Sequence, residues 1–354
     1  MTVTALGLPS IRGAVDQQAG GMPRSGPLVD TFGRVATDLR VSLTDRCNLR
    51  CTYCMPAEGL NWLPGDELLT RDELIRLLRL AVTRLGITNV RFTGGEPLLY
   101  RDLEAVVAAV AALRPRPEMA MTTNGVGLAK RAQRLADAGL DRVNVSLDSL
   151  DAGHFAAITR RDRLSDVLAG LSAAAAAGLG PVKVNAVLNP ASGLADAVEL
   201  LHYCLEYGYQ LRIIEQMPLD ADHQWRRDAA LTADEIFATL AGRFDLTPDT
   251  APRGSAPAQL WRVNGGPATV GIIASVSHAF CSACDRTRLT ADGQIRSCLF
   301  ATEETDLRAL LRGGADDAEL ESTWRAAMWR KAAGHGINDP DFVQPQRPMS
   351  AIGG

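Results

Sequence analysis

The feature that most restricts this 354-residue sequence is a repeated alternation of short β-type runs with amphipathic helical runs. The six candidate strands begin at Asp38, Asn89, Glu118, Arg142, Val182 and Leu211. Helical stretches such as RDELIRLLRLAVTRLG lie between them, with apolar residues at three- and four-residue intervals. This alternation predicts a parallel sheet with helices packed outside it. Six units are too few for an eight-stranded barrel, so we expect an α/β fold built on a partial (β/α)6 barrel.

The composition of the chain suggests three regions. Residues 1–30 are rich in Gly, Pro, Ser and Gln and have little periodicity, which predicts a disordered N-terminal extension. The strand–helix alternation covers 31–218, the predicted barrel domain, and the remaining 219–354 are predicted to form a C-terminal domain. The stretch 167–182, mostly Ala and Gly, is too short and too weakly apolar for a membrane span and favours a buried helix.

Charge and hydropathy argue against several function classes. The net charge of −4 predicts no nucleic-acid footprint, so any basic site must be a local pocket. The chain opens without an apolar signal region, and we therefore expect no secretion, no membrane partner and a cytoplasmic location.

Six of the seven cysteines form two groups of three. They are Cys47, Cys51 and Cys54 in a C-x3-C-x2-C run, and Cys281, Cys284 and Cys298 in a C-x2-C-x13-C run. Clustered cysteines in a cytosolic chain are more typical of metal binding than of disulfides. Cys204, the seventh, lies on the apolar face of a helical pattern and is expected to be a buried hydrophobe.

The number of thiols in each group limits the possible metals. A structural zinc site uses four protein ligands, whereas three thiolates on a four-iron cluster leave one iron open to a small molecule. At the second group, His278 stands three residues before Cys281, so a Cys3His zinc site and a second iron–sulfur cluster both remain open.

Polar or glycine-rich motifs follow the predicted strands. The cysteine run follows the first strand, and the others are TGGEP at 93–97, TTNG from Thr122, SLDS from Ser146 and EQMP at 215–218. In open α/β sheets and barrels, ligands bind beyond the carboxyl ends of the strands. We therefore expect these motifs to meet at one site.

Basic residues on the same strands indicate an anionic ligand. Arg286 and Arg288 are two residues apart on the first strand of a predicted hairpin, so both point to one face. Arg40 and Lys183 alternate with apolar neighbours and can point into the barrel, and Arg91 lies on the second strand. Guanidinium groups beside a metal site suit a phosphate, which would also balance charge inside a barrel.

The first cysteine run resembles the radical S-adenosylmethionine superfamily. The C-x3-C-x2-C spacing, Tyr53 before the third cysteine, and GGEP as the second motif carry this resemblance. It implies a 4Fe–4S cluster whose open iron binds the amino and carboxylate groups of S-adenosylmethionine. Electron transfer would then release a 5′-deoxyadenosyl radical.

Further motifs narrow the resemblance to the GTP 3′,8-cyclase family, also called molybdenum cofactor biosynthesis protein A. They are DLRVSLTDRCNLRCTYCMP, VRFTGGEPLL, TTNG, NVSLDSL, VKVN, CSACDRTRLTADGQIRSCLF and the terminal IGG, spanning Arg34 to Gly354. The resemblance implies the first step of molybdenum cofactor biosynthesis. The adenosyl radical would take the ribose 3′ hydrogen of GTP, and the carbon radical would attack C8 of the guanine. Reduction and proton transfer would give (8S)-3′,8-cyclo-7,8-dihydroguanosine 5′-triphosphate.

The same resemblance assigns roles to individual residues. It implies a first cluster on Cys47, Cys51 and Cys54, and a second on Cys281, Cys284 and Cys298. Contacts with S-adenosylmethionine are implied for Tyr53, Gly95, Ser146 and Met217. Contacts with GTP are implied for Arg40, Arg91, Thr122, Lys183, Arg286 and Arg288. Catalytic roles are implied for Arg286, Arg288, Gly353 and Gly354, the last two in a C-terminal tail that enters the active site.

Partners and alternatives follow from the same comparison. The resemblance implies a flavodoxin- or ferredoxin-type electron donor, a homodimer, and cyclic pyranopterin monophosphate synthase as the next enzyme of the pathway. Another twin-cluster radical enzyme, such as a peptide maturase, would usually carry more auxiliary cysteines. A non-catalytic iron–sulfur or zinc module would have no need for GGEP or for motifs at five strand ends.

Overall fold

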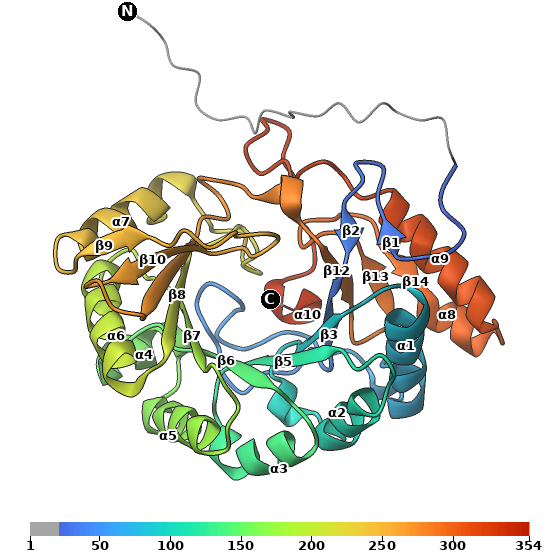
Figure 1. Ribbon diagram of the computed structural model, residues 1–354, viewed down its shortest axis with the longest axis horizontal. Helices are drawn as coiled ribbons and strands as arrows, with labels where there is room; N and C mark the ends of the chain where they lie inside the picture. Colours follow the sequence, from blue (N-terminus) through green and yellow to red (C-terminus); the bar gives the residue numbers. More distant parts are fainter. Residues whose placement is uncertain (1–20, 354) are drawn as a thin grey trace, which may run out of the picture.

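A computed structural model describes residues 21–353, and within that range one twelve-stranded sheet dominates the fold. The strands run in the order β14-β13-β12-β3-β4-β5-β6-β7-β8-β11-β10-β9. Their bounds are β3 (Asp38–Ser42), β4 (Asn89–Thr93), β5 (Glu118–Thr123), β6 (Arg142–Ser146), β7 (Lys183–Val187), β8 (Gln210–Ile214), β9 (Leu246–Pro248), β10 (Gln259–Val263), β11 (Thr269–Ile273), β12 (Arg286–Leu289), β13 (Gln294–Arg296) and β14 (Thr305–Asp306). The sheet curves into an open arc, with the C-terminal helix inside it (Figure 1).

The six predicted strands are confirmed as β3 to β8, and they pair in parallel in sequence order. The partial barrel is therefore confirmed. The sequence did not predict that the barrel is extended at both ends by strands from the C-terminal third of the chain. β12 pairs in parallel with β3, and β11 pairs in parallel with β8. Because β9 to β14 join the same sheet, the domain boundary at residue 218 stays a prediction.

Helices cover the outer face of the arc (Figure 1). Their bounds are α1 (Arg71–Arg84), α2 (Leu103–Ala111), α3 (Ala132–Asp137), α4 (Ala152–Thr159), α5 (Leu164–Ala176), α6 (Gly193–Tyr207), α7 (Ala233–Ala241), α8 (Leu307–Arg312) and α9 (Asp317–Trp329). The helix inside the arc is α10 (Met349–Ile352). The apolar core lies between these helices and the sheet. Residues such as Leu39, Phe92 and Val143 are fully buried there, and their strand neighbours Arg40 and Arg91 point the other way, into the arc.

Helix α1 shows how local sequence defines an element. Its first turn is closed by a capping box, in which Thr70 accepts from the Glu73 N–H and the Glu73 carboxylate accepts from the Thr70 N–H. Its apolar stripe includes Leu74, Leu77 and Leu78, which are buried against the sheet. The predicted helix in 167–182 is also present, as α5, although it ends at Ala176.

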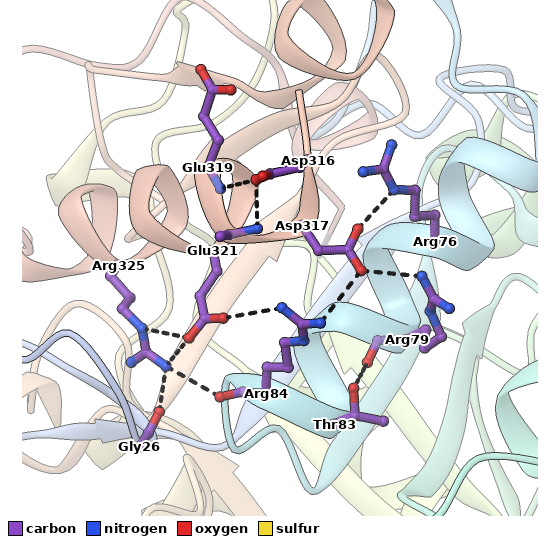
Figure 2. Close-up of polar contacts among 11 residues, drawn as sticks. Gly26, Arg76, Arg79, Thr83, Arg84, Asp316, Asp317, Glu319, Glu321 and Arg325 are labelled. Atoms are coloured by element: carbon purple, nitrogen blue, oxygen red, sulfur yellow. Dashed lines mark hydrogen bonds and ion pairs between the residues drawn. The ribbon is translucent and has the colours of Figure 1, made fainter. Parts of the chain in front are cut away.

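An ion-pair network joins α9 to α1 across the outer surface (Figure 2). Asp317 accepts from Arg76 at 2.9 Å and from Arg79 at 3.2 Å. One turn further along α9, Glu321 forms an ion pair with Arg84 of α1 at 3.8 Å. These contacts attach the last long helix of the chain to the first helix of the barrel, a link that neither segment indicates by itself.

The N-terminal segment differs from the prediction at its end. Residues 1–20 of the predicted extension lie outside the described residues. However, β1 (Leu28–Val29) pairs with β2 (Val35–Ala36), and Leu28 is fully buried. Within the described residues, strand pairing therefore begins before residue 31, where an apolar pair anchors the chain. No helix among residues 21–353 is long and apolar enough to cross a membrane.

Candidate active site

A cavity of about 410 Å³ lies inside the arc, and most of the residues singled out from the sequence surround it. The cavity is lined by Arg40, Tyr53, Arg91, Thr122, Ser146, Lys183, Met217, Cys281, Cys284, Arg286, Arg288 and Cys298. They come from β12 and from β3 to β7, and from the loops that follow β3, β8, β11 and β13. The predicted convergence of strand ends is therefore observed for this set.

Sheet register creates a cationic wall on one side of the cavity. Arg288 on β12 lies directly opposite Arg40 on β3, and Arg40 lies opposite Arg91 on β4. Arg286, two residues before Arg288, faces the same space and lies over the Phe280 ring at 5.1 Å. Adjacent like charges repel, so this wall favours a polyanion that can bind several guanidinium groups at once.

The pKa values and the unpaired donors of this cationic wall also favour an anionic ligand. Burial and repulsion from neighbouring arginines lower the pKa of Arg40 and of Arg91. The Nε atoms of both side chains are buried without a hydrogen-bond partner in the described part of the chain. One carboxylate offsets part of the charge, since Arg40 and Arg91 outweigh burial and lower the pKa of Asp38. Buried donors without acceptors are costly, and phosphate oxygens would satisfy them.

The opposite side of the cavity contains residues that the sequence reasoning did not select. Arg212 on β8 is buried and lines the cavity, as do Asn144 and Asn185. Burial and repulsion from Arg212 lower the pKa of Lys183 to about 8. A signal was present, because Arg212 alternates with the buried Leu211 and Ile213 just as Arg40 does with its neighbours.

Close backbone packing forms the first cysteine site. A Cβ atom on Gly95 would lie 2.3 Å from the Arg46 carbonyl oxygen, and one on Gly94 would lie 2.4 Å from that of Thr44. The Gly95 and Glu96 N–H groups donate to these two carbonyls, at 2.7 Å to Thr44 and 2.8 Å to Arg46. Glycine is therefore required for TGGEP to pack against the cysteine loop.

Glu96 links three motifs beneath that loop. Its buried carboxylate accepts from the Thr123 hydroxyl and from the Asn124 N–H, both at 2.7 Å. Burial raises the pKa of Glu96 to about 7. The Asn124 side chain in turn donates to the Cys47 sulfur at 3.7 Å. TGGEP and TTNG thus act together to position the first cysteine loop.

The first-site thiols lie in an environment that disfavours free thiolates. Burial raises the pKa of Cys51 well above its ordinary value, and Cys54 and Cys47 raise it further. Burial and Cys47 raise the pKa of Cys54 to about 12. All seven cysteines, which lie within residues 21–353, are free. Three neighbouring, half-buried cysteines fit a bound iron cluster, which supplies the positive charge that thiolates need there.

Tyr53 connects the first loop to the cavity. Its hydroxyl donates to Asp148 at 2.8 Å, and Asp148 also accepts from the Val187 N–H at 2.8 Å. Burial raises the pKa of Asp148 to about 6. Because Tyr53, Ser146 and Met217 line the cavity while Gly95 packs behind it, three of the four residues predicted to bind S-adenosylmethionine face the same space.

The second cysteine site is surrounded by cations. Burial alone would raise the pKa of Cys284, but Arg286 and Lys331 outweigh it and lower that pKa. Arg34 donates to the Cys281 carbonyl oxygen at 2.9 Å. The predicted hairpin is confirmed, because β12 and β13 are antiparallel on either side of a turn at 290–293.

His278 does not join the second cysteine group. Its side chain is mostly exposed and its Nε2 lies 3.3 Å from Asp234 Oδ1, and it does not line the cavity. Among residues 21–353, no group of three or more His, Cys, Asp or Glu side chains is arranged to hold a single metal ion.

Known proteins match the chain along its whole length. The Radical SAM superfamily model matches residues 41–204, and the Molybdenum Cofactor Synthesis C model matches residues 209–337. A GTP 3′,8-cyclase of Mycobacterium sp. (strain KMS) is 77% identical over 354 residues, covering 100% of both chains. The chain belongs to the GTP 3′,8-cyclase family. The GTP 3′,8-cyclase of Mycolicibacterium smegmatis is 75% identical over 361 residues, and GTP 3′,8-cyclase 2 of Mycobacterium tuberculosis (strain H37Rv) is 71% identical over 362, each with full coverage of both chains.

A solved structure supports the fold of this family member. Streptococcus suis SuiB bound to S-adenosylmethionine superposes with a TM-score of 0.52 at 16% identity, covering 82% of this chain and 68% of that chain. At that identity the likeness concerns the fold alone. GTP 3′,8-cyclases are radical S-adenosylmethionine enzymes with two 4Fe–4S clusters. This chain has two cysteine triplets, and all six of these cysteines are free.

The C-terminal tail of this GTP 3′,8-cyclase family member reaches the barrel interior. Ile352 is fully buried in a small apolar cluster with Leu219, Val276, Phe300 and Ile337. Arg288 donates a hydrogen bond to the Gly353 carbonyl oxygen. Gly353 has φ +82, and a Cβ atom there would lie 2.5 Å from Ser42 Oγ. Gly354 lies outside the described residues.

Proposed function

We propose that this chain cyclises GTP to (8S)-3′,8-cyclo-7,8-dihydroguanosine 5′-triphosphate, the first step of molybdenum cofactor biosynthesis. The cavity is the observation that carries the proposal, because it joins a cationic wall to the second cysteine triplet and to Tyr53 of the first loop. A nucleoside triphosphate has the two ends that such a cavity needs: a polyanion for the arginines and a base for the second site. Family membership supports GTP as the nucleotide.

The cofactors divide the chemistry between the two sites. Cys47, Cys51 and Cys54 would hold a first cluster, which with S-adenosylmethionine would supply a 5′-deoxyadenosyl radical, and Cys281, Cys284 and Cys298 would hold a second cluster, which would bind guanine. The protein binds and orients the substrate, and excludes water from the cavity. We assign contacts with S-adenosylmethionine to Tyr53, Ser146 and Met217, and the close backbone packing behind them to Gly95.

GTP contacts are assigned from the cavity wall. Arg40, Arg91, Arg286 and Arg288 would bind the triphosphate, since two of them have buried Nε atoms without an acceptor. Thr122 and Lys183 line the far side, and Arg212 is added to this set because it is buried on the same surface. These assignments place the ribose between the two cysteine sites.

The tail completes the enclosure of the reaction. Arg288 holds the Gly353 carbonyl while also lining the cavity, so the tail and the triphosphate wall share one side chain. We assign a catalytic role to Gly353 and Gly354, together with Arg286 and Arg288, in which the tail completes the cleavage of S-adenosylmethionine. No larger residue than glycine fits at 353 beside Ser42 and Thr93.

The partners form the remaining part of the proposal. A flavodoxin- or ferredoxin-type protein would supply electrons, and cyclic pyranopterin monophosphate synthase would consume the product. We further propose a homodimer and a cytoplasmic location, where thiols and clusters are kept reduced.

The test is GTP-dependent radical formation. Purified protein is reconstituted anaerobically with iron and sulfide, reduced, and given S-adenosylmethionine with GTP that carries deuterium at C3′. We expect 5′-deoxyadenosine to form only with GTP and to carry the deuterium. Formation without GTP dependence would point to another radical enzyme, such as a peptide maturase, and no formation at all would point to a non-catalytic iron–sulfur module.

A further inference from the structure

Lys331 is a buried lysine whose ammonium group contacts the second cysteine site. Its side chain is almost fully buried, and Nζ donates to Cys284 Sγ at 3.3 Å. Nζ also donates to the Cys284 carbonyl at 3.2 Å and to the Arg286 carbonyl at 2.8 Å. A lysine ammonium has three donor hydrogens, and here each has one acceptor. A neutral amine would have only two hydrogens for the same three acceptors.

The surrounding fold holds this ammonium in place. Lys331 lies two residues after the end of α9 at Trp329, and its own N–H donates to the Met328 carbonyl. Helix α9 is attached to the sheet by Trp324, which is fully buried and donates to Thr287 on β12 at 3.3 Å. The outer surface of α9 is attached to α1 by the ion pairs of Asp317 (Figure 2).

A second cation strengthens the same connection from the N-terminal side. Arg34 donates to the carbonyls of Ala332 and Ala333 at 2.6 and 2.8 Å, as well as to that of Cys281. The segment after α9 is therefore tied to the cysteine loop by Arg34 and by Lys331 together. Only Lys331 reaches a sulfur atom, so it is the cation that acts on the ligand itself.

In the part of the chain that the structure describes, the Cys47 sulfur of the first site has no charged donor. The donors to Cys47 Sγ are the Leu49 N–H at 3.5 Å and the Asn124 side-chain amide at 3.7 Å, and both are neutral. Arg50, the nearby cation, donates instead to the Cys47 and Leu49 carbonyls. The donors to Cys51 and Cys54 are Tyr53 and Ser350, which are also neutral. Within residues 21–353, the charged contact to a ligand sulfur is therefore found at the second site.

We propose that Lys331 is a positioning residue of the second cluster, which holds the Cys284 thiolate and raises the reduction potential of that cluster. Net charge and hydrogen bonds to the sulfurs set the potentials of iron–sulfur clusters. Reduction adds negative charge, and a fixed ammonium on a ligand thiolate stabilises the reduced form more than the oxidised form. The inference rests on the proposed ligand set of Cys281, Cys284 and Cys298.

The experiment measures the second cluster alone in the full-length chain. A parent protein carries Cys47→Ala, Cys51→Ala and Cys54→Ala, so that only the second site can bind iron. Anaerobic reconstitution is followed by iron analysis and a redox titration monitored by electron paramagnetic resonance. A parent that binds no cluster overturns the ligand set and the inference together, whereas a loaded parent leaves Lys331 to be tested separately.

Three substitutions in that parent separate charge from shape. In Lys331→Met, the ratio of reduced to oxidised cluster at the parent's midpoint potential should fall about tenfold, or about 59 mV for a one-electron couple. Lys331→Gln keeps a donor without the charge and should shift the same way, whereas Lys331→Arg should remain close to the parent. Lys130→Met, the same substitution at an exposed lysine, is the matched control and should change nothing.

The outcomes are distinguishable. A loaded Lys331→Met with an unchanged midpoint potential overturns the inference. If Lys331→Met binds no iron, the Lys331→Gln variant provides the test. An unchanged midpoint potential in Lys331→Gln overturns the inference as well. A shifted midpoint potential in Lys331→Met, together with an unshifted one in Lys331→Arg, supports a charge effect and not a packing effect.

Discussion

Cys54 at the first site and Cys284 at the second have opposite electrostatic surroundings. Burial and Cys47 raise the pKa of Cys54 to about 12, whereas Arg286 and Lys331 hold the pKa of Cys284 below its ordinary value. The first loop is shaped by backbone packing against Gly94 and Gly95. The second lies at the junction of distant segments and among cations. Two sites with the same number of thiols thus depend on different forces: close packing at the first and charge at the second.

The largest expected effect is the loss of the first cluster alone. In Gly95→Ala, the added Cβ would lie 2.3 Å from the Arg46 carbonyl, and overpacking of this kind costs about 1–3 kcal/mol. We expect loss of the first cluster and of 5′-deoxyadenosine formation, with iron retained at the second site. Iron analysis and Mössbauer spectroscopy measure both.

Gly65→Ala is the control for that prediction. No atom lies within 4 Å of a Cβ built at Gly65, so this variant should bind iron at both sites. Full iron content and normal activity in Gly95→Ala would contradict the packing argument.

The second prediction concerns the cationic wall. Arg91→Met removes a buried guanidinium, and hydrogen bonds to charged groups contribute about 1.5–3 kcal/mol, so GTP should bind roughly 10–100-fold more weakly. Both clusters should remain, because Arg91 lies on β4 and not on either cysteine loop. Equilibrium binding of GTP to the reconstituted protein is the measurement, with the exposed Arg101→Met as control. Equal affinity in both variants would remove Arg91 from the substrate site.

A third prediction compares the two thiols directly. In protein without iron, Cys284 should be alkylated by iodoacetamide at least about tenfold faster than Cys54 at neutral pH, because the thiolate is the reactive form. Peptide mass spectrometry over time gives both rates in one sample. Faster alkylation of Cys54 would reverse the electrostatic contrast on which this comparison rests.

The fourth prediction uses pH. Burial and Arg212 lower the pKa of Lys183 to about 8, from an ordinary 10.5, so raising the pH through that value removes a charge from the cavity. Between about pH 7.5 and about pH 9, GTP affinity should fall a few-fold more in the protein with Lys183 than in the Lys183→Met variant. The lysine of the unfolded chain keeps its proton over this range, so the Lys183 contribution to stability should rise with pH between about 8 and 10.5. Parallel pH profiles in the two proteins would count against a role for Lys183 in binding the triphosphate.

The smallest effect concerns the surface network of Figure 2. Asp317→Asn weakens ion pairs to Arg76 and Arg79 and should lower the free energy of unfolding by less than about 1 kcal/mol. This decrease should be smaller at high salt, because salt screens surface charges. Denaturant titration measures this, with Asp228→Asn in an exposed surface pair as control. Loss of iron from the second site in Asp317→Asn would mean that the ion pairs, and not the packing of Trp324, position the segment that carries Lys331.

The sequence predicted the parts of the site that are encoded locally. Six barrel strands, the two cysteine triplets and the hairpin after Cys284 follow from spacing and periodicity within short windows, and each is present. Gly95 was selected by motif, although its physical role, close approach to the Arg46 carbonyl, is visible only in three dimensions. Arg212 was missed even though its strand alternates in the same way as that of Arg40.

The sequence by itself determined the candidate residues for the chemistry: the thiols, the glycines that follow strands, and the basic residues on alternating strand positions. Only the tertiary structure decided which cations surround which thiols. Arg34 meets Cys281 across 247 positions, Arg288 meets Gly353 across 65, and Lys331 meets Cys284 across 47. Periodicity and motif spacing reflect contacts between near neighbours in the chain, whereas electrostatic energies depend on distance in space, and folding brings these charges together.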